Sequence, residues 1–236
     1  MMEKAHAPFT PIYLGRFSFL FVSIILSFAL IPFLEGFVGI KILMDIFLSV
    51  ILISAIHTIS RQRHTLIIAL ALACPCLIFK WSNYLLPTPL LWDLTEVFGA
   101  LFTVYVLISI WSFIIRQQEV TADVIMAAMC GYFILGFMWG FIYLFLETVH
   151  PGSFQIAKNG SGDQSNFIYF SFITMTTVGY GDTTPVSNAA RSLAVLEAVM
   201  GQLYIAVTIA RLMGTYLSQR QEKQDGGNVV PAKNSD

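Results

Sequence analysis

The stretch that decides the fold reads Thr176-Thr177-Val178-Gly179-Tyr180-Gly181-Asp182, and an apolar segment of helical length lies on each side of it. Glycine adopts positive φ without a steric penalty, so Gly179 and Gly181 allow left-handed backbone at alternate positions. Such a backbone can turn successive carbonyl groups inward, while Val178 and Tyr180 turn their side chains away. The letters Gly-Tyr-Gly alone also fit a tight turn in a loop. The flanking apolar segments favour instead a loop that dips into a membrane.

Inward-facing carbonyl oxygens have a specific chemical use. An alkali-metal cation gives up its water only where other oxygens replace that water, and rings of backbone carbonyls do this for K⁺. The oxygens that we expect to bind K⁺ belong to Thr177, Val178, Gly179, Tyr180 and Gly181, and the Thr177 hydroxyl lies at the inner end. The chain has one such loop and an ion needs about four around it, so we expect a homotetramer, with three identical partner subunits.

Bulk composition agrees with a membrane protein. Hydrophobic residues make up 56 % of the chain and charged residues 11 %, with a mean hydropathy of +0.73, whereas a soluble domain carries about 25 % charge. The net charge of −1 gives no reason to expect nucleic acid as a partner. Cys74-Pro75-Cys76 could be a metal pair, but the two side chains point to different helix faces, which favours small core residues. We find no phosphate loop, catalytic triad or metal-ligand cluster, and we expect neither an enzyme nor a cofactor.

Six apolar segments meet or approach the roughly 20 residues that a membrane helix needs. The third is short and contains Pro75, so it is the least secure. The predicted fold class is an all-α integral membrane protein with six transmembrane helices, a re-entrant pore helix and a selectivity filter. The segments are 17–34, 37–56, 66–79, 90–115, 124–146 and 191–217.

The basic residues predict the orientation of these segments. With the amino terminus in the cytoplasm, nine of the 13 Lys and Arg residues fall on the inner side, as the positive-inside rule requires. The same choice places Asp182 at the outer end of the filter. We therefore expect a multi-pass protein of the cell membrane with both termini cytoplasmic.

The chain divides into a cytoplasmic amino terminus, two membrane modules and a tail. Residues 17–115 are four helices, which match a voltage-sensor domain in number. A sensor needs several Arg or Lys on its fourth helix, but residues 90–115 contain none, so steep voltage gating is not expected. The predicted divisions are 1–16 for the amino terminus, 17–115 for the sensor-like module, 116–123 for a linker, 124–217 for the pore module and 218–236 for a disordered tail.

The acidic residues of the first module have no assigned role. Asp93 and Glu96 lie one turn apart near the outer end, where they could pair with Lys80 or sense protons. Asp45 lies one turn after Lys41, which suggests a local ion pair.

Within the pore module, a polar loop at 148–165 leads into a short helix that ends near Thr176. Either Ser165 or Asn166 can cap this helix, which is too short to span a membrane and must return. Its carboxyl end carries partial negative charge, which favours a cation near it. An aromatic cuff that holds the filter at one diameter is expected from Tyr169, Phe170 and Phe172.

The segment from Tyr169 to Asp182 closely resembles the signature of the potassium-channel superfamily, and the chain as a whole resembles its bacterial six-helix, one-pore-loop type. The resemblance continues through the Asp-x-x-Pro sequence at 182–185 and a glycine in the middle of the inner helix, Gly201. It implies passive K⁺ permeation through a homotetramer, without a resident cofactor. Residues expected to support the filter are Tyr169, Phe170, Thr176, Asp182 and Glu197.

One departure from the family pattern concerns the back of the filter. Some bacterial relatives carry a glutamate there that pairs with the outer aspartate, whereas this chain has Ile173. Tyr169 could donate a hydrogen bond to Asp182 instead. Glu197 faces the back of the pore helix, and we hypothesise that it bonds Thr174 or a backbone group; a plain structural carboxyl is the alternative.

Helical spacing assigns the faces of the last apolar segment. Together with Gly201, the residues expected to line the cavity and the inner gate are Gln202, Ile205, Ala206, Ile209 and Met213. Arg211 falls on the opposite face, where Glu119, Asp123 or anionic lipid of the inner leaflet is the expected partner.

Three other functions remain open at this stage: a weakly selective cation channel, a subunit of a potassium transporter, and a silent subunit that needs another chain. Transporters of this kind place four loops in one chain, and coupled transporters tend to show inverted repeats. The gating stimulus is also open among lipid, tension, pH and constitutive opening.

Overall fold

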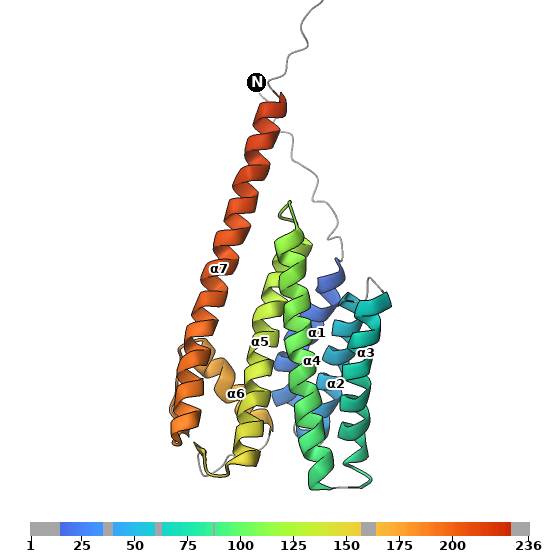
Figure 1. Ribbon diagram of the computed structural model, residues 1–236, viewed down its shortest axis with the longest axis vertical. Helices are drawn as coiled ribbons and strands as arrows, with labels where there is room; N and C mark the ends of the chain where they lie inside the picture. Colours follow the sequence, from blue (N-terminus) through green and yellow to red (C-terminus); the bar gives the residue numbers. More distant parts are fainter. Residues whose placement is uncertain (1–14, 35–39, 60–62, 87, 157–163, 228–236) are drawn as a thin grey trace, which may run out of the picture.

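The structure is a computed structural model that describes residues 15–34, 40–59, 63–86, 88–156 and 164–227. These residues form seven helices and one small two-stranded sheet (Figure 1). The sheet was not predicted from the sequence. The elements are α1 (Arg16–Leu34), α2 (Ile40–Ile59), α3 (Arg63–Ser82), α4 (Pro89–Arg116), α5 (Ala122–Val149), β1 (Phe154–Ile156), α6 (Gln164–Met175), β2 (Thr183–Pro185) and α7 (Asn188–Gly227).

The helices form two units side by side: a bundle of α1 to α4, and a second unit of α5, α6 and α7. Helices α1 to α4 form a bundle, and α5 packs against both α1 and α4 on one side and against α6 and α7 on the other. The short helix α6 lies between α5 and α7, while α7 projects past the ends of the other helices (Figure 1). Helix α5 is therefore the shared wall of the two units.

Among the described residues, four helical stretches are long and apolar enough to cross a membrane: Arg63–Ser82, Asp93–Arg116, Ala122–Val149 and Asn188–Gln221. In the described part of α1 and α2, the apolar stretches are shorter, at Arg16–Ala29 and Leu48–Thr58. Large apolar side chains are exposed on the outer helices, among them Ile67, Ile78 and Ile108. Helices that are apolar on all sides suit lipid surroundings. That the chain has six membrane spans stays a prediction, because α1 and α2 are not among these four stretches.

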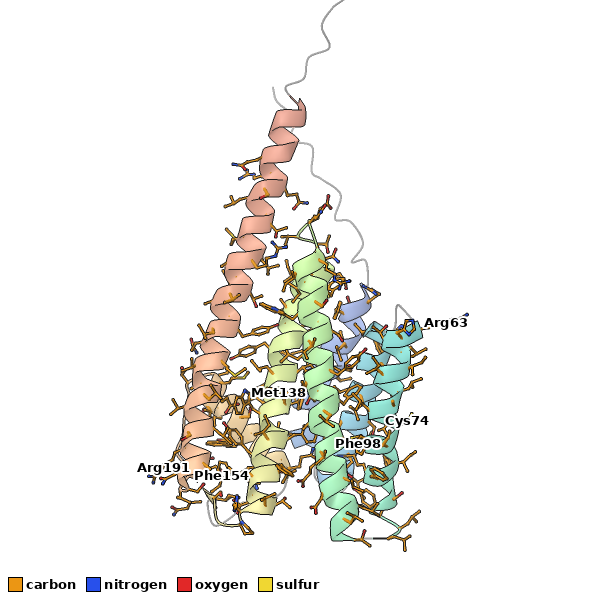
Figure 2. All side chains as sticks on the ribbon, viewed as in Figure 1. Arg63, Cys74, Phe98, Met138, Phe154 and Arg191 are labelled. Atoms are coloured by element: carbon orange, nitrogen blue, oxygen red, sulfur yellow. The ribbon has the colours of Figure 1, made fainter. Side chains whose placement is uncertain are left out.

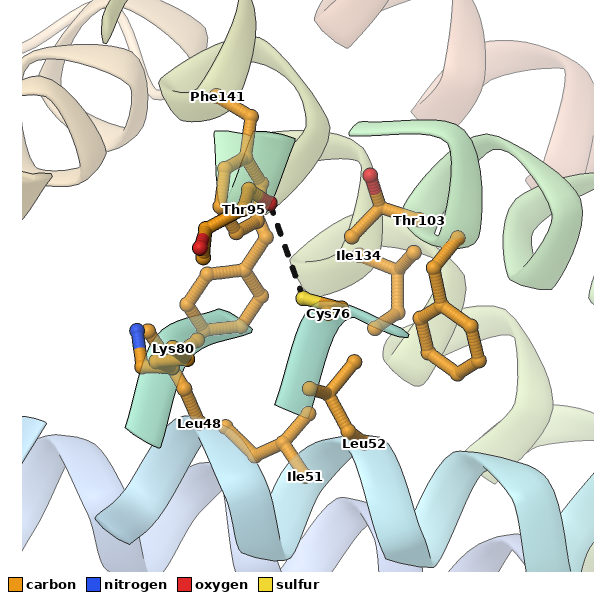
Figure 3. Close-up of a pocket in the computed structure, with 11 residues that line it drawn as sticks. Leu48, Ile51, Leu52, Cys76, Lys80, Thr95, Thr103, Ile134 and Phe141 are labelled. Carbon is orange, nitrogen blue, oxygen red and sulfur yellow. Dashed lines mark hydrogen bonds between the residues drawn. The ribbon is translucent and has the colours of Figure 1, made fainter. Parts of the chain in front are cut away.

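The bundle encloses a cavity of only about 20 Å³, with walls from α2, α3, α4 and α5 (Figure 3). A volume of this size holds about one water molecule. Cys76 lies in its wall and donates through Sγ to the Thr95 carbonyl, 3.8 Å away, whereas Cys74 is exposed on the outside of α3 (Figure 2). The two thiols thus point apart, and the expected role as a small core residue is confirmed for Cys76 but is wrong for Cys74.

A lysine that forms an ion pair within the bundle also donates a hydrogen bond to α6, the helix that precedes the filter segment. Lys80 Nζ lies 2.7 Å from Asp45 Oδ1 and donates to Gln164 Oε1 at 3.2 Å, and Gln164 is the first residue of α6. Tyr84 donates to the other Asp45 oxygen at 2.6 Å. The suggested pairing of Lys80 with Asp93 or Glu96 is therefore wrong, and the suggested partner Lys41 has its side chain outside the described residues.

Glu96 instead accepts a hydrogen bond from Thr148 of α5, at 3.3 Å. This bond joins the outer ends of α4 and α5, so one acid of the first module has a structural partner across the shared wall.

The boundaries around the second unit differ from prediction mainly at the tail. Helix α4 ends at Arg116, and α5 begins after Thr121, whose side chain accepts from the Val124 amide at 3.4 Å. Helix α7 continues to Gly227, so disorder from residue 218 onward is wrong for 218–227. Gln219 accepts from the Val120 amide at 3.4 Å, which anchors part of this extension. Residues 228–236 lie outside the described residues.

The ion pair between α2 and α3 predicts a stability effect. Lys80→Met leaves the Asp45 carboxylate buried without its cation, and breaking such a pair costs about 3–5 kcal/mol. The free energy of unfolding, measured in mixed micelles, should fall by that amount. The double variant Lys80→Met/Asp45→Leu removes both charges and should recover most of the loss; a double variant as unstable as the single one would contradict the assignment.

Candidate functional site

The filter segment has left-handed backbone at alternate residues. The φ angles are 62° at Thr177, 54° at Gly179 and 78° at Gly181, and the two residues between them have negative φ. The amides of Val178 and Gly179 both donate to the Ile173 carbonyl, at 2.9 and 3.1 Å. These two peptide N–H groups therefore face the pore helix α6. In the described part of the chain no hydrogen-bond donor contacts the carbonyl oxygens of 177–181.

The positive φ at Thr177 was not predicted, because the sequence argument assigned this conformation to glycine alone. A β-branched residue with positive φ is an outlier, and such backbone costs roughly 1–3 kcal/mol. Strain of this kind persists where surrounding contacts hold it. Here the Thr177 amide donates to the Thr174 carbonyl at 3.0 Å, which fixes the turn out of α6.

In the single chain, the filter lies open on one side. Val178 is 50 % exposed and Tyr180 is 73 % exposed, although their backbone is fixed. Large apolar side chains exposed on a rigid segment mark a surface that another chain or lipid covers. One chain by itself therefore leaves this apolar surface uncovered.

Helix α6 is seated on α5 through two glycines. A Cβ at Gly140 would lie 3.0 Å from Cα of Ile168, and one at Gly136 would lie 2.6 Å from the Phe172 ring. Small residues four apart let two helices approach closely in a membrane. The Gly-x-x-x-Gly spacing at 136–140 is a signal that the sequence analysis missed.

The expected aromatic cuff is wrong for two of its three members. Phe170 is buried against Tyr143 and Phe154, and Phe172 packs on Phe28 and Phe137, all within the same chain. These rings hold α6 against α1, α5 and β1 rather than encircle the filter.

Tyr169 differs from the other two aromatics. It donates to Asp182 Oδ2 at 2.8 Å, as suggested from the sequence, and Asp182 Oδ1 accepts from the Thr183 amide at 3.0 Å. This bond joins α6 to the outer end of the filter. At the inner end, the Thr176 hydroxyl donates to the Phe172 carbonyl at 2.6 Å.

Helix α6 begins at Gln164, so the suggestion that Ser165 or Asn166 caps it is wrong; both lie inside its first turn. The loop before it, at 157–163, lies outside the described residues. Strand β1 pairs antiparallel with β2, with Phe154 opposite Pro185, and this sheet fixes the chain on both sides of α6 and the filter.

Glu197 is fully buried between α5, α6 and α7. Its carboxyl group lies 2.5 Å from the hydroxyls of Tyr143 and Ser171. Glu197 thus lies behind the pore helix, as expected, but its hydrogen-bond partners are Tyr143 and Ser171 and not the suggested Thr174. Tyr143 and Ser171 were missed because nothing in the sequence spacing aligns residues of three different helices.

The inner helix α7 contacts its own chain through one face only. Gly201 is buried, and a Cβ there would lie 2.6 Å from Cγ of Met175, so this residue packs against the end of α6 rather than lining a cavity. Tyr204 donates to the Ala128 carbonyl at 2.8 Å. The other residues assigned to the cavity are exposed in the single chain: Gln202, Ile205, Ala206, Ile209 and Met213.

Arg211 contacts helix α4 instead of an acid. Its guanidinium donates to the Ile115 carbonyl at 2.7 Å and to the Gln117 carbonyl at 3.4 Å. These are free carbonyls at the end of α4, where positive charge is favourable. The proposed partners Glu119 and Asp123 are thus wrong, and Asp123 instead accepts from the Phe17 amide at 3.0 Å.

Comparison with known proteins supports the interpretation of this second unit. Residues 129–218 match the ion channel family model. The chain is 33 % identical over 86 residues to two pore potassium channel a of Oryza sativa subsp. japonica and 37 % identical over 68 residues to two-pore potassium channel 1 of Arabidopsis thaliana. It is 34 % identical over 86 residues to the protein LctB of Geobacillus stearothermophilus.

These matches cover only part of each protein. They include 35, 29 and 34 % of this chain and 24, 18 and 62 % of the respective relatives. The chain thus spans about a quarter or less of the two plant channels. No solved structure matches it. The family match and the potassium channels among the relatives support the potassium-channel superfamily, and the long apolar helices fit a membrane protein.

The close seat of α6 on α5 predicts a packing effect. Gly140→Ala places a methyl group against backbone of Ile168, and overpacking of this kind costs about 1–3 kcal/mol. We expect a lower unfolding temperature in detergent. Gly214→Ala is the matched control, since nothing lies within 4 Å of its added carbon; it should leave stability unchanged or slightly higher. Equal losses in both variants would contradict the assigned contact.

Proposed function

We propose that this chain is one of four identical subunits of a K⁺-selective channel, which conducts passively along the axis that the four filter segments share. The observation that carries the proposal is the filter backbone. The backbone has alternate left-handed residues, two amides that donate to the Ile173 carbonyl, and carbonyl oxygens that contact no donor among the described residues. Such an arrangement can replace the water of a K⁺ ion. K⁺ is then the transported ion rather than a resident cofactor.

Assembly of four chains is supported by what one chain leaves open. The filter side chains Val178 and Tyr180 are exposed, and so is most of the apolar surface of α7. A closed ring of four copies covers such surfaces by symmetry. Gln202, Ile205, Ile209 and Met213 would then line the inner cavity and the gate.

The absence of steep voltage gating is part of the proposal. Helix α4 carries no Lys or Arg before Arg116, its last residue, so it lacks the row of basic charges that a change in membrane potential moves in a voltage sensor. The orientation proposed from the basic residues places both termini in the cytoplasm and Asp182 outside.

Flux through liposomes that contain only the purified chain tests the proposal. A K⁺ gradient should drive ion flux, and the reversal potential in mixed Na⁺ and K⁺ should follow the K⁺ gradient. A reversal potential near zero would favour the weakly selective cation channel. Flux that depends on a second solute gradient would indicate a transporter subunit, and no flux would indicate a chain that needs a partner.

Substitution in the filter gives the sharpest mutational prediction. Gly179→Ala forces a side chain into left-handed backbone, which costs about 1–2 kcal/mol in each subunit. The carbonyl positions should shift, and selective K⁺ flux should fall to the background of empty liposomes.

Gly152→Ala is the matched control, because Gly152 has a φ of 82° and open space around it, as Gly179 has, but lies in the loop after α5. It should retain flux and selectivity. Selective K⁺ flux through Gly179→Ala would contradict the mechanism, and equal loss in both variants would indicate a folding defect instead.

A further inference from the structure

The buried carboxyl group of Glu197 contacts two hydroxyl groups, and one of them has a second partner. Tyr143 OH lies 2.5 Å from Glu197 Oε2, and Ser171 Oγ lies 2.5 Å from Glu197 Oε1. Ser171 Oγ also lies 2.8 Å from the Gly136 carbonyl oxygen. Ser171 therefore sits between a carbonyl oxygen and a carboxyl oxygen, both within hydrogen-bonding distance.

Counting hydrogens decides which group donates. A serine hydroxyl has one hydrogen, and a carbonyl oxygen can only accept. The contact between Ser171 and Gly136 thus uses the serine hydrogen. The contact between Ser171 and Glu197 then needs a hydrogen from Glu197, which only the protonated acid has.

The ionised form fits this geometry poorly. If Glu197 accepted from both Tyr143 and Ser171, the Ser171 and Gly136 oxygens would face each other at 2.8 Å with no hydrogen between them. A carboxylate without exposed surface is also very costly unless a cation pairs with it. The one ion pair among the described residues joins Lys80 to Asp45, so none reaches Glu197.

The groups around Glu197 are all neutral. From α5 the titratable groups are Tyr143 and Tyr132, and Tyr132 donates to the Met175 carbonyl at 3.4 Å. From α6 the polar contact is Ser171, and the neighbouring turns of α7 in contact with this region present Leu193, Ala194, Met200 and Gly201.

We infer that Glu197 is held as a neutral carboxylic acid that donates its hydrogen to Ser171 and so positions the pore helix. The hydrogen bonds then run in one direction: Tyr143 to Glu197, Glu197 to Ser171, and Ser171 to the Gly136 carbonyl. Each donor is used once, and the chain of bonds joins α7 to α6 and α6 to α5. Fully satisfied networks of this kind fix a unique packing.

The neutral state of Glu197 is independent of the proposed function, and only its expected effect on ion conduction rests on that function. Ser171 lies two residues before Ile173, whose carbonyl holds the amides of Val178 and Gly179. A shift of α6 at Ser171 would therefore move the filter backbone. Glu197 is a positioning residue, since it acts on the filter through α6.

The inference predicts which substitution is tolerated. In Glu197→Gln the amide N–H₂ can donate to Ser171 and the amide oxygen can accept from Tyr143, as the neutral acid does. Glu197→Asp keeps the acid but shortens the side chain by one methylene, so it cannot reach both hydroxyls. We expect Glu197→Gln to match the wild type in K⁺ flux and reversal potential, and Glu197→Asp to lose flux.

Infrared difference spectroscopy of the full chain in lipid at pH 7 tests the protonation directly. The wild type minus Glu197→Gln spectrum should contain the carbonyl band of a protonated carboxyl group. Tyr143→Phe is a second variant with a conservative change, and loss of its hydrogen bond should shift that band. Carboxylate bands in either difference spectrum would overturn the inference.

The flux measurement separates the positioning role of Glu197 from the proposed channel function. A protonated band with normal flux in Glu197→Gln and reduced flux in Glu197→Asp supports both the neutral acid and its positioning role. Loss of flux in Glu197→Gln while the wild type conducts would overturn the positioning role. If the wild type itself does not conduct, the proposed function fails, and the infrared result still decides whether Glu197 is neutral.

Discussion

The constraint on which the structure depends is that a filter for a dehydrated cation must keep its carbonyl oxygens free of internal donors. Ordinary helices and sheets pair most of their backbone carbonyl groups with donors within the fold. Alternating left-handed backbone at Thr177, Gly179 and Gly181 avoids this, because the amides turn back to Ile173 while the carbonyls do not. The cost of this strained, unpaired backbone must be offset by the contacts that surround it.

Those contacts converge on α6 from every side within the chain. Gly136 and Gly140 let α5 approach closely, Gly201 does the same for α7, and Tyr169 fixes the outer end of the filter through Asp182. The buried hydrogen bonds of Glu197 join all three helices. The α1–α4 bundle adds Lys80, which reaches the first residue of α6. In this chain, the bundle therefore contacts α6 directly, which suits a supporting role for the bundle in the proposed channel.

Local patterns predicted the helices and the left-handed backbone at Gly179 and Gly181, because apolar runs and a glycine alternation are properties of neighbouring residues. Glu197 could be assigned to the back of the pore helix by helical spacing alone. Its partners could not, since Tyr143 and Ser171 come from separate helices whose rotation is set by packing. The same reason explains the errors at Phe170, which packs inward, and at Arg211, which binds carbonyls of α4. The extension of helix α7 past its apolar part was also missed. The contact that anchors it, between Gln219 and Val120, is tertiary and leaves no local pattern in the sequence.

The central claim is that four copies of this chain bring the carbonyls of 177–181 around one axis. Electron cryo-microscopy of the purified protein in K⁺ tests it most directly. The account predicts a fourfold particle with separate densities along the axis between successive layers of these carbonyls. A monomer or dimer whose filter segments face lipid, or a tetramer whose filter segments lie away from the axis, would contradict it.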